Sequence, residues 1–175
     1  MSKNNFKSIY DEYCQLVYNV CLNYLQNTED AEDVTQEVFV KIHRKLDTFN
    51  QQSSLKTWVY RIAINACLDY LKAQKNKKSV FFSISIMNNI NVLPVISDFN
   101  HPGVLLENKE ALKTLFEKIN TLPVNQKTAI ILKSIEKLSQ KEIAETMNLS
   151  TKAVESLLSR ARKNLKEKLN SLVIE

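Results

Sequence analysis

Side chains that can hydrogen-bond to DNA recur at helical spacing between residues 152 and 162. This segment overlaps the end of the run KEIAETMNLSTKAVESLLSR. Lysine and arginine donate to guanine or to phosphate, glutamate accepts from cytosine, and serine can do either. The residues expected on the outward face of this segment are Lys152, Glu155, Ser156, Ser159, Arg160 and Arg162. The pattern predicts a helix that can enter the major groove of DNA.

A shorter helix in front of this segment has to position it. Ile143 and Ala144 are expected on that first helix, and a turn follows at Asn148. The small side chain of Ala144 allows two helices to cross closely, and Leu149 with Val154 can form an apolar pair across the corner. This spacing indicates a helix-turn-helix. The alternative is a plain helical hairpin whose charges are solvated, because amphipathic helix pairs are common.

A second group of polar and aromatic residues lies in the run WVYRIAIN. An aromatic ring, a guanidinium and an amide on one helix can stack on a base, neutralise a phosphate and bond to a base edge, as single-stranded DNA requires. The three residues are Trp58, Arg61 and Asn65. Spacing alone favours the core for the indole of Trp58. Arg61 and Asn65 share the polar face of the expected helix, which favours a functional role for them.

Five carboxylates lie within nine residues of the first half of the chain. They are Glu29, Asp30, Glu32, Asp33 and Glu37. Their mutual repulsion on a helix has to be relieved by solvent, by the helix dipole or by a basic partner. The dipole is sufficient for a structural interpretation, since these acids lie near the expected helix start. A structural role and a partner-binding role are therefore both open.

Apolar residues at helical spacing predict an all-α protein made of two small helical domains. Three amphipathic helices are expected at about residues 6–24, 31–46 and 55–73, and three such helices can close one core. Helices resume at Leu112 and lead into the helix-turn-helix. The chain contains a single glycine, Gly103, which argues against the tight turns and phosphate-binding loops of sheet enzymes.

The predicted domains are residues 1–76 and 108–175, joined by a linker at residues 77–107. The linker contains Pro94 and Pro102 and has no sustained period of 3.6 residues. Its apolar content leaves three interpretations open: the linker docks on a partner, holds a short strand, or packs on its own domains.

Charge along the chain is concentrated in two basic zones. The net charge is +5, but residues 71–80 hold four lysines and no acid, and residues 121–175 hold ten basic and six acidic side chains. Two basic zones separated by near-neutral chain are expected of a protein that touches a polyanion at two places.

Several other classes of protein are disfavoured. Cys14, Cys21 and Cys67 contain no CxxC pair, and with His43 and His101 they give no zinc-like spacing, so no metal or cofactor is expected. No nucleophile is paired with a base, which makes an enzyme the least favoured class. No apolar run approaches the ~20 residues that span a bilayer, and the N-terminus lacks a signal-peptide core. A reducing cytoplasm is the expected location.

Four segments, taken in order, resemble a known group of proteins. They are DAEDVTQEVFVKIHRKL, LKTWVYRIAINACLDYL, LPVNQKTAIIL and LSQKEIAETMNLSTKAVESLLSRARKNL. They are similar to the region 2 and region 4 domains of bacterial RNA polymerase sigma factors of the extracytoplasmic-function (ECF) group. The resemblance spans nearly the whole chain except residues 77–107. It implies binding to core RNA polymerase, recognition of the −35 and −10 promoter elements, and promotion of transcription initiation. An anti-sigma factor, often membrane-anchored, is a further implied partner.

The resemblance also implies roles for three sets of residues. The core polymerase set is Asp30, Asp33, Gln36 and Glu37. The −10 set is Trp58, Arg61 and Asn65, with Lys72, Lys75, Lys77 and Lys78 on the phosphates of adjoining duplex. The −35 set is the outward face of residues 152–162 described above. Asp69 fits a DNA-binding face less well and is expected to hold Arg61 or Lys72 in place.

Two positions depart from the family pattern. Many relatives have arginine where Glu155 stands and glycine where Asn148 stands. Asparagine tolerates the left-handed conformation of such a turn, so the fold is expected to be unaffected. The glutamate leaves open which bases are read.

Two other functions compete with a sigma factor. A stand-alone helix-turn-helix regulator would bind duplex operator DNA by itself, whereas a sigma factor needs core polymerase. The acidic segment and the WVYRIAIN helix favour the sigma factor. A helical adaptor that binds only proteins is the second rival, and the two basic zones weigh against it.

Overall fold

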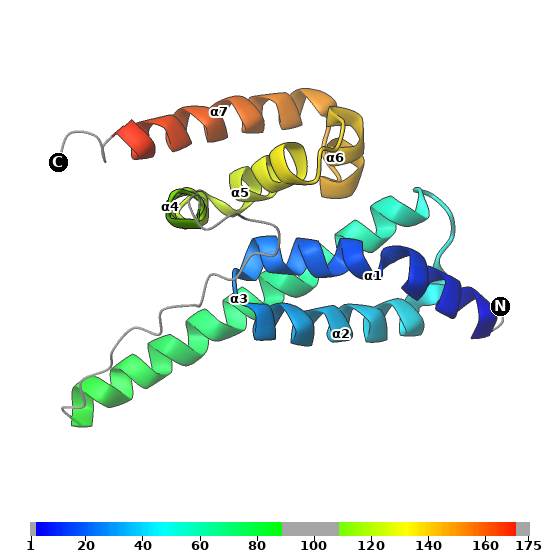
Figure 1. The fold of residues 1–175 in the computed structure, drawn as a ribbon, viewed down its shortest axis with the longest axis horizontal. Coiled ribbons are helices and arrows are strands. Elements are labelled where there is room, and N and C mark those ends of the chain that lie inside the picture. Colours follow the sequence, from blue (N-terminus) through cyan, green and yellow to red (C-terminus); the bar gives the residue numbers. More distant parts are fainter. Residues whose placement is uncertain (1–2, 89–108, 171–175) are drawn as a thin grey trace. The chain divides into compact units, whose positions relative to one another are not determined.

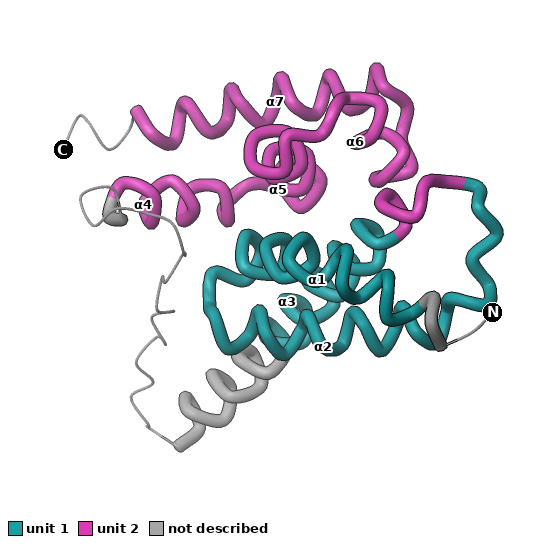
Figure 2. The backbone as a smooth tube through the Cα atoms, turned by 45° about the vertical axis from the view of Figure 1, so that its right-hand side comes forward, with its two compact units in different colours: residues 1–52, 59–101 teal, residues 53–58, 102–175 magenta. Residues whose placement is uncertain are grey.

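The protein is all-α in the residues that the structure describes. The structure is a computed structural model that describes residues 3–88 and 109–170, and within them the side chains of residues 6–76 and 111–170. These residues form helices and turns without a strand, as predicted (Figure 1). The chain divides into two compact units, residues 1–52 with 59–101, and residues 53–58 with 102–175 (Figure 2).

In its described residues, the first unit is built on three helices, of which the third begins in residues 55–58 of the second unit. They are α1 (Lys3–Leu25), α2 (Thr28–Lys45) and α3 (Leu55–Asn88), and a 3₁₀ turn, η1 (Leu46–Thr48), follows α2. Each helix contributes side chains that are no more than 1% exposed: Val17 and Val20 from α1, Val34 and Val38 from α2, and Val59 and Ala63 from α3. The apolar stripes read from the sequence therefore meet in one core, which stabilises the unit by removing apolar surface from water.

The acidic segment begins α2, where its charges suit the helix. Asn27 caps the helix by accepting a hydrogen bond of 2.9 Å from the backbone N–H of Asp30. Glu29 and Asp30 lie in the first turn, where the dipole favours negative charge, and the last turn is basic. The helix dipole therefore accounts for the carboxylates of Glu29 and Asp30. It does not account for Asp33 and Glu37, which lie in later turns.

Helix α3 is longer than the sequence predicted. Ser54 starts it by accepting a hydrogen bond of 3.1 Å from the backbone N–H of Thr57, and the helix continues to Asn88, beyond residue 76. Hydrophobic periodicity detects helices that bury one face. An established helix can also propagate where no breaker interrupts it, and the first proline after residue 76 is Pro94. The rest of the predicted linker, residues 89–107, lies outside the described residues.

Between residues 109 and 170, the second unit contains four α-helices and a π-helical turn. They are α4 (Lys109–Asn120), α5 (Val124–Ile130), the π turn η3 (Ile131–Ile135), α6 (Gln140–Met147) and α7 (Thr151–Asn170). Helix α7 contacts α4, α5 and α6. Its buried side chains are Val154, Leu158 and Ala161, which alternate with exposed polar residues at helical spacing.

A partly buried hydrogen bond links α7 to α5. The amide of Asn164 donates a hydrogen bond of 2.9 Å to Oε1 of Gln126, whose side chain is 8% exposed. A buried amide requires such a partner, so this contact restricts how α7 can slide along α5. The helix that carries the predicted DNA-reading face is therefore held by its opposite side.

Candidate nucleic-acid interface

The turn between α6 and α7 has the left-handed conformation expected at Asn148. This residue has φ 54° and ψ 48°, and the backbone N–H of Leu149 donates a hydrogen bond of 2.9 Å to the carbonyl of Ala144. Asparagine occupies this region at a lower cost than most residues other than glycine. The prediction that asparagine can replace glycine in this turn is confirmed.

Side-chain caps set the starts of both helices of the motif. Ser139 and Glu142 form a reciprocal capping box at α6, with hydrogen bonds of 2.8 and 3.2 Å. The hydrogen bonds from Ser139 lower the pKa of Glu142. At α7, the backbone N–H of Ala153 donates to Oγ of Ser150 at 3.2 Å. The S-x-x-E spacing at residue 139 is a start signal that the sequence analysis left unused.

The corner of the motif is closed by buried side chains from both helices. Ile143 and Val154 are fully buried and Ala144 is 5% exposed, which confirms the close crossing of α6 and α7. Leu149, the expected partner of Val154, is 38% exposed. The apolar contact between Leu149 and Val154 stays a prediction.

All six residues predicted to read duplex DNA lie on the exposed side of α7. They are Lys152, Glu155, Ser156, Ser159, Arg160 and Arg162. Arg160 is partly oriented by its own helix, since its Nε donates a hydrogen bond of 3.3 Å to the carbonyl of Ser156. The face therefore offers donors and acceptors together, on a helix whose opposite side is buried. This arrangement suits insertion into a major groove.

A second polar stripe runs along α3. It contains Trp58, Arg61, Asn65, Lys72 and Lys75, which follow one another at helical spacing. Trp58 and Arg61 are partly exposed, and the other three are exposed. The indole is thus not the fully buried core residue that its spacing favoured. The side chains of Lys77 and Lys78 lie outside the described part of the chain.

Asp69 lies on the same stripe and contacts a residue that the sequence did not indicate. Its Oδ2 is 3.9 Å from Nζ of Lys41 on α2, and that ammonium is also 2.8 Å from Glu37. The prediction from the sequence was that Asp69 holds Arg61 or Lys72. The spacing along α3 could not show that a lysine of α2 approaches Asp69, because the contact depends on how the two helices pack.

The predicted polymerase-binding residues of α2 fall into two environments. Asp33, Gln36 and Glu37 are exposed, and their side chains can reach a partner. Asp30 is partly buried and faces its own protein: its Oδ1 accepts a hydrogen bond of 2.6 Å from Tyr70, and its Oδ2 accepts one of 3.3 Å from Gln74. The structure therefore brings Asp30 to α3 rather than to the exposed row.

The described residues contain neither a metal cluster nor a membrane span. No group of three His, Cys, Asp or Glu in residues 3–88 and 109–170 could hold a metal ion, and no helix there is long and apolar enough to cross a bilayer. Cys21 and Cys67 are buried, and Cys14 is partly buried. A hydrogen bond with Cys67 lowers the pKa of Cys21, against the effect of burial.

Comparisons with known proteins identify both halves of the chain. Residues 9–77 match the family model for sigma-70 region 2, and residues 112–165 match the model for sigma-70 region 4. The chain is 32% identical to the ECF RNA polymerase sigma factor SigW of Bacillus subtilis, over 95% of this chain and 90% of that protein. It is 31% identical to the ECF RNA polymerase sigma-E factor of Haemophilus influenzae, over 98% of this chain and 90% of that protein.

Solved structures share the fold. The sigma factor RpoE of Bartonella quintana, in complex with the anti-sigma factor NepR, aligns with a TM-score of 0.67 at 25% identity, over 95% of this chain and 97% of that one. CnrH, in complex with the cytosolic domain of CnrY, aligns with a TM-score of 0.67 at 21% identity, over 97% of this chain and 90% of that one.

Proposed function

We propose, because this chain belongs to the ECF group of the sigma-70 family, that it uses three separate surfaces to bind core polymerase, the −10 element and the −35 element. The chain is a sigma factor that promotes the initiation of transcription by core RNA polymerase. The assignment of residues to the separate tasks is the part that we propose. It rests on exposure, charge and spacing in the described helices.

The −35 element is read by the exposed face of α7. Arg160 and Lys152 donate to guanine or phosphate, and Glu155 accepts from the amino group of cytosine. Ser156 and Ser159 adapt as donors or acceptors. Arg162 lies at the end of this face and binds the phosphate backbone, which adds affinity without sequence preference. The capped, buried framework beneath these residues supports the assignment, because a rigid helix positions its side chains at little entropic cost.

The −10 element is captured as a single strand by the stripe on α3. The partly exposed indole of Trp58 offers a stacking surface, and Arg61 with Asn65 follows it along one face. Lys72 and Lys75 continue that face with positive charge for the phosphates of adjoining duplex. Lys77 and Lys78 are assigned to the same phosphates from their positions in the sequence, because their side chains lie outside the described residues.

Core polymerase is bound by the exposed row of α2. Asp33, Gln36 and Glu37 present two carboxylates and an amide on consecutive turns, which fits a basic helix of the polymerase. Asp30 supports this row from its buried side through Tyr70. Its contribution is to fix the first turns of α2 against α3 while the neighbouring acids contact the partner.

The proposal also covers the two domains of the protein, its location in the cell and its inhibition by a partner. Residues 1–76 and 108–175 act as the two functional domains on a connection at 77–107, which the matches to residues 9–77 and 112–165 support. The protein acts in the bacterial cytoplasm, without enzymatic activity of its own. An anti-sigma factor restrains it, as the complex of the similar Bartonella quintana protein with NepR indicates for that protein.

One observation carries the residue assignment: the chain presents an exposed acidic row on α2 and a DNA-binding stripe on α3 in addition to its helix-turn-helix. A stand-alone regulator would need only the last of these. The test is transcription from a genomic promoter library with purified chain and core enzyme. Start-site choice that depends on the chain supports the proposal. Specific duplex binding by the chain alone, with no effect on core polymerase, would favour the regulator.

A further inference from the structure

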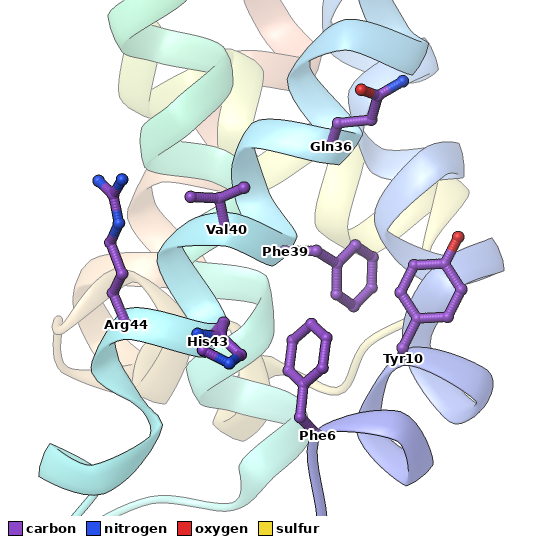
Figure 3. A pocket seen from close by; sticks show the side chains of 7 residues that line it. All are labelled: Phe6, Tyr10, Gln36, Phe39, Val40, His43 and Arg44. Carbon is purple, nitrogen blue, oxygen red and sulfur yellow. The ribbon is translucent and has the colours of Figure 1, made fainter. Parts of the chain in front are cut away.

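Large apolar side chains are exposed at a few places in the described part of the chain. They are Tyr10, Val40, Val124 and Leu149. Tyr10 and Val40 lie together, because both line one hollow in the first unit beside Phe39 (Figure 3). Leu149 lies instead in the turn of the helix-turn-helix, directly in front of the helix proposed to read duplex DNA. A single exposed apolar residue is normal in a protein, so the inference depends on the position of this leucine.

The backbone of Leu149 is fixed on both sides. Asn148 before it is left-handed, and the backbone N–H of Leu149 donates a hydrogen bond of 2.9 Å to the carbonyl of Ala144 on α6. The carbonyl of Ser150 after it accepts a hydrogen bond of 3.1 Å from the backbone N–H of Val154 on α7. A ligand that covers Leu149 therefore meets a side chain on a pre-organised backbone, which lowers the entropy cost of binding.

Part of the Leu149 side chain is available to a ligand. The side chain is 38% exposed. Its covered part can pack against Val154, as predicted from the sequence, while the exposed part is left in water. Removing that part from water against an apolar group of a ligand is favourable.

The surroundings of Leu149 suit the approach of DNA. Residues 148–152 are all exposed, and no acid occurs between residues 146 and 154. A recognition helix contacts base edges with its N-terminal residues, and those of α7 follow Leu149 by two positions. When α7 enters the major groove, Leu149 is therefore carried to the edge of the same groove.

One base presents an apolar group in the major groove. Thymine carries a C5-methyl group there, whereas adenine, guanine and cytosine are told apart by their hydrogen-bond donors and acceptors. The side chain of leucine has neither a donor nor an acceptor, so thymine is the base that it can distinguish. The six residues on the exposed face of α7 are all polar or charged, and none of them duplicates this contact.

We propose that Leu149 is a specificity-determining residue of the −35 interaction and contacts the C5-methyl group of a thymine. The inference rests on the proposed role of α7 and adds an apolar contact to its polar face. It places the thymine at the edge of the −35 element that the start of α7 reaches.

The test removes one methyl group from the DNA and leaves every base pair intact. The probe is a promoter duplex selected by the full chain with core polymerase from a genomic library. Each thymine of its −35 element, on either strand, is replaced in turn by deoxyuridine. The affinity of the holoenzyme for the thymine duplex, divided by its affinity for the deoxyuridine duplex, gives one ratio for each position. Because both duplexes are measured with the same protein, effects of a substitution on folding or on core binding cancel in this ratio.

The ratios are compared between the wild type and three variants. Leu149→Ala removes the proposed contact, and Leu149→Met keeps a large apolar side chain. Val124→Ala is the matched control, because Val124 is an aliphatic residue of the same unit that is 55% exposed but lies at the start of α5.

We expect one thymine at which the wild type binds the methylated duplex about fourfold more tightly, as the burial of one methyl group predicts. Leu149→Ala should bring this ratio close to one, while Leu149→Met and Val124→Ala should keep it. Leu149→Ala that weakens binding to all duplexes equally, or that leaves every ratio unchanged, would overturn the proposal, since a contact with sugar or with polymerase is insensitive to the methyl group. A selected −35 element without thymine on either strand would also refute it.

Failure of this inference is distinguishable from failure of the proposed function. The wild-type holoenzyme is also measured on a duplex whose −35 element is scrambled. Preference for the selected element, without a ratio that depends on residue 149, would leave the role of α7 intact and remove that of Leu149. Equal affinity for the selected and the scrambled element would overturn the role of α7 itself.

Discussion

The hydroxyl of Tyr70 on α3 donates a hydrogen bond of 2.6 Å to Oδ1 of Asp30 on α2, and Gln74 donates to both groups at 3.1 and 3.3 Å. Burial raises the pKa of Tyr70, and the bond to Asp30 raises it further, so the phenol stays protonated as the donor. This contact joins the helix of the acidic row to the helix of the DNA-binding stripe. The spatial relation between the two surfaces therefore depends partly on Asp30.

Replacing Tyr70 by Phe should destabilise the first domain. The substitution removes the donor to Asp30, and hydrogen bonds to charged groups contribute about 1.5–3 kcal/mol. Because Tyr70 is only partly buried, we expect the free energy of unfolding to fall by about 1–2 kcal/mol. Urea unfolding of the full chain measures it. Tyr18→Phe, at another partly exposed tyrosine of the same domain, is the control, and an equal change in both variants would contradict the assigned contact.

Reversing the charges of Asp33 and Glu37 should remove polymerase binding while the fold survives. Both side chains are exposed, and the ion pair of Glu37 with Lys41 is of the surface kind that contributes little to stability. We expect the affinity of Asp33→Lys/Glu37→Lys for core polymerase to fall by roughly a hundredfold or more. Co-purification with core enzyme and the melting temperature are the measurements. Glu117→Lys/Glu167→Lys changes the net charge equally at exposed positions of the second unit. Unchanged co-purification of the first variant would remove the assignment.

Most of the fold could be predicted because apolar periodicity records which helix faces are buried. Val34, Val38 and Ile42 read as one stripe and are all buried. The same signal missed the end of α3, because residues 77–88 have no sustained apolar period although no proline or glycine interrupts the helix there.

The candidate site was predictable where it lies on one helix and not where it lies between two. The six residues on the exposed face of α7 follow from spacing alone. The contacts of Asp30 with Tyr70 and of Lys41 with Asp69 join residues that are 40 and 28 positions apart, and they depend on helix packing. The hollow that Phe6 and Tyr10 of α1 line together with Phe39 of α2 likewise depends on helix packing.

Arg160→Ala should change the base preference of the −35 interaction. If Arg160 contacts a base, its loss costs about 1–3 kcal/mol and relaxes specificity at one position. Lys163 is exposed on α7 beside Arg162, where it can contact the phosphate backbone. Lys163→Ala should therefore weaken binding equally for all sequences and lower the slope of log affinity against log salt concentration by about one. Holoenzyme binding to a set of −35 variants at several salt concentrations separates the two effects. Unaltered affinity and preference in Arg160→Ala would show that this side chain makes no base contact.

Two substitutions of Asn148 should change the stability of the protein in opposite directions. Asn148→Gly should keep or raise stability by up to about 1 kcal/mol, because glycine adopts φ 54° without strain from a side chain. Asn148→Val should lower it by about 1–2 kcal/mol, since a β-branched residue is strongly disfavoured there. Thermal unfolding of the full chain followed by circular dichroism is the measurement. A valine variant as stable as the glycine variant would mean that the turn is not left-handed.

Tyr13 should make the protein less stable in alkaline solution. Burial raises the pKa of this phenol from 10.0 to about 12, and a hydrogen bond with Glu12 adds to the effect. Because the folded state holds the proton more tightly than the unfolded chain, the contribution of Tyr13 is fully present below pH 10 and is lost as the pH rises toward 12. The free energy of unfolding of Tyr13→Phe, measured by urea titration from pH 8 to pH 12, should therefore fall less steeply above pH 10 than that of the wild type. The difference between the two proteins at pH 8 serves as the baseline, and parallel curves above pH 10 would show that Tyr13 ionises equally in both states.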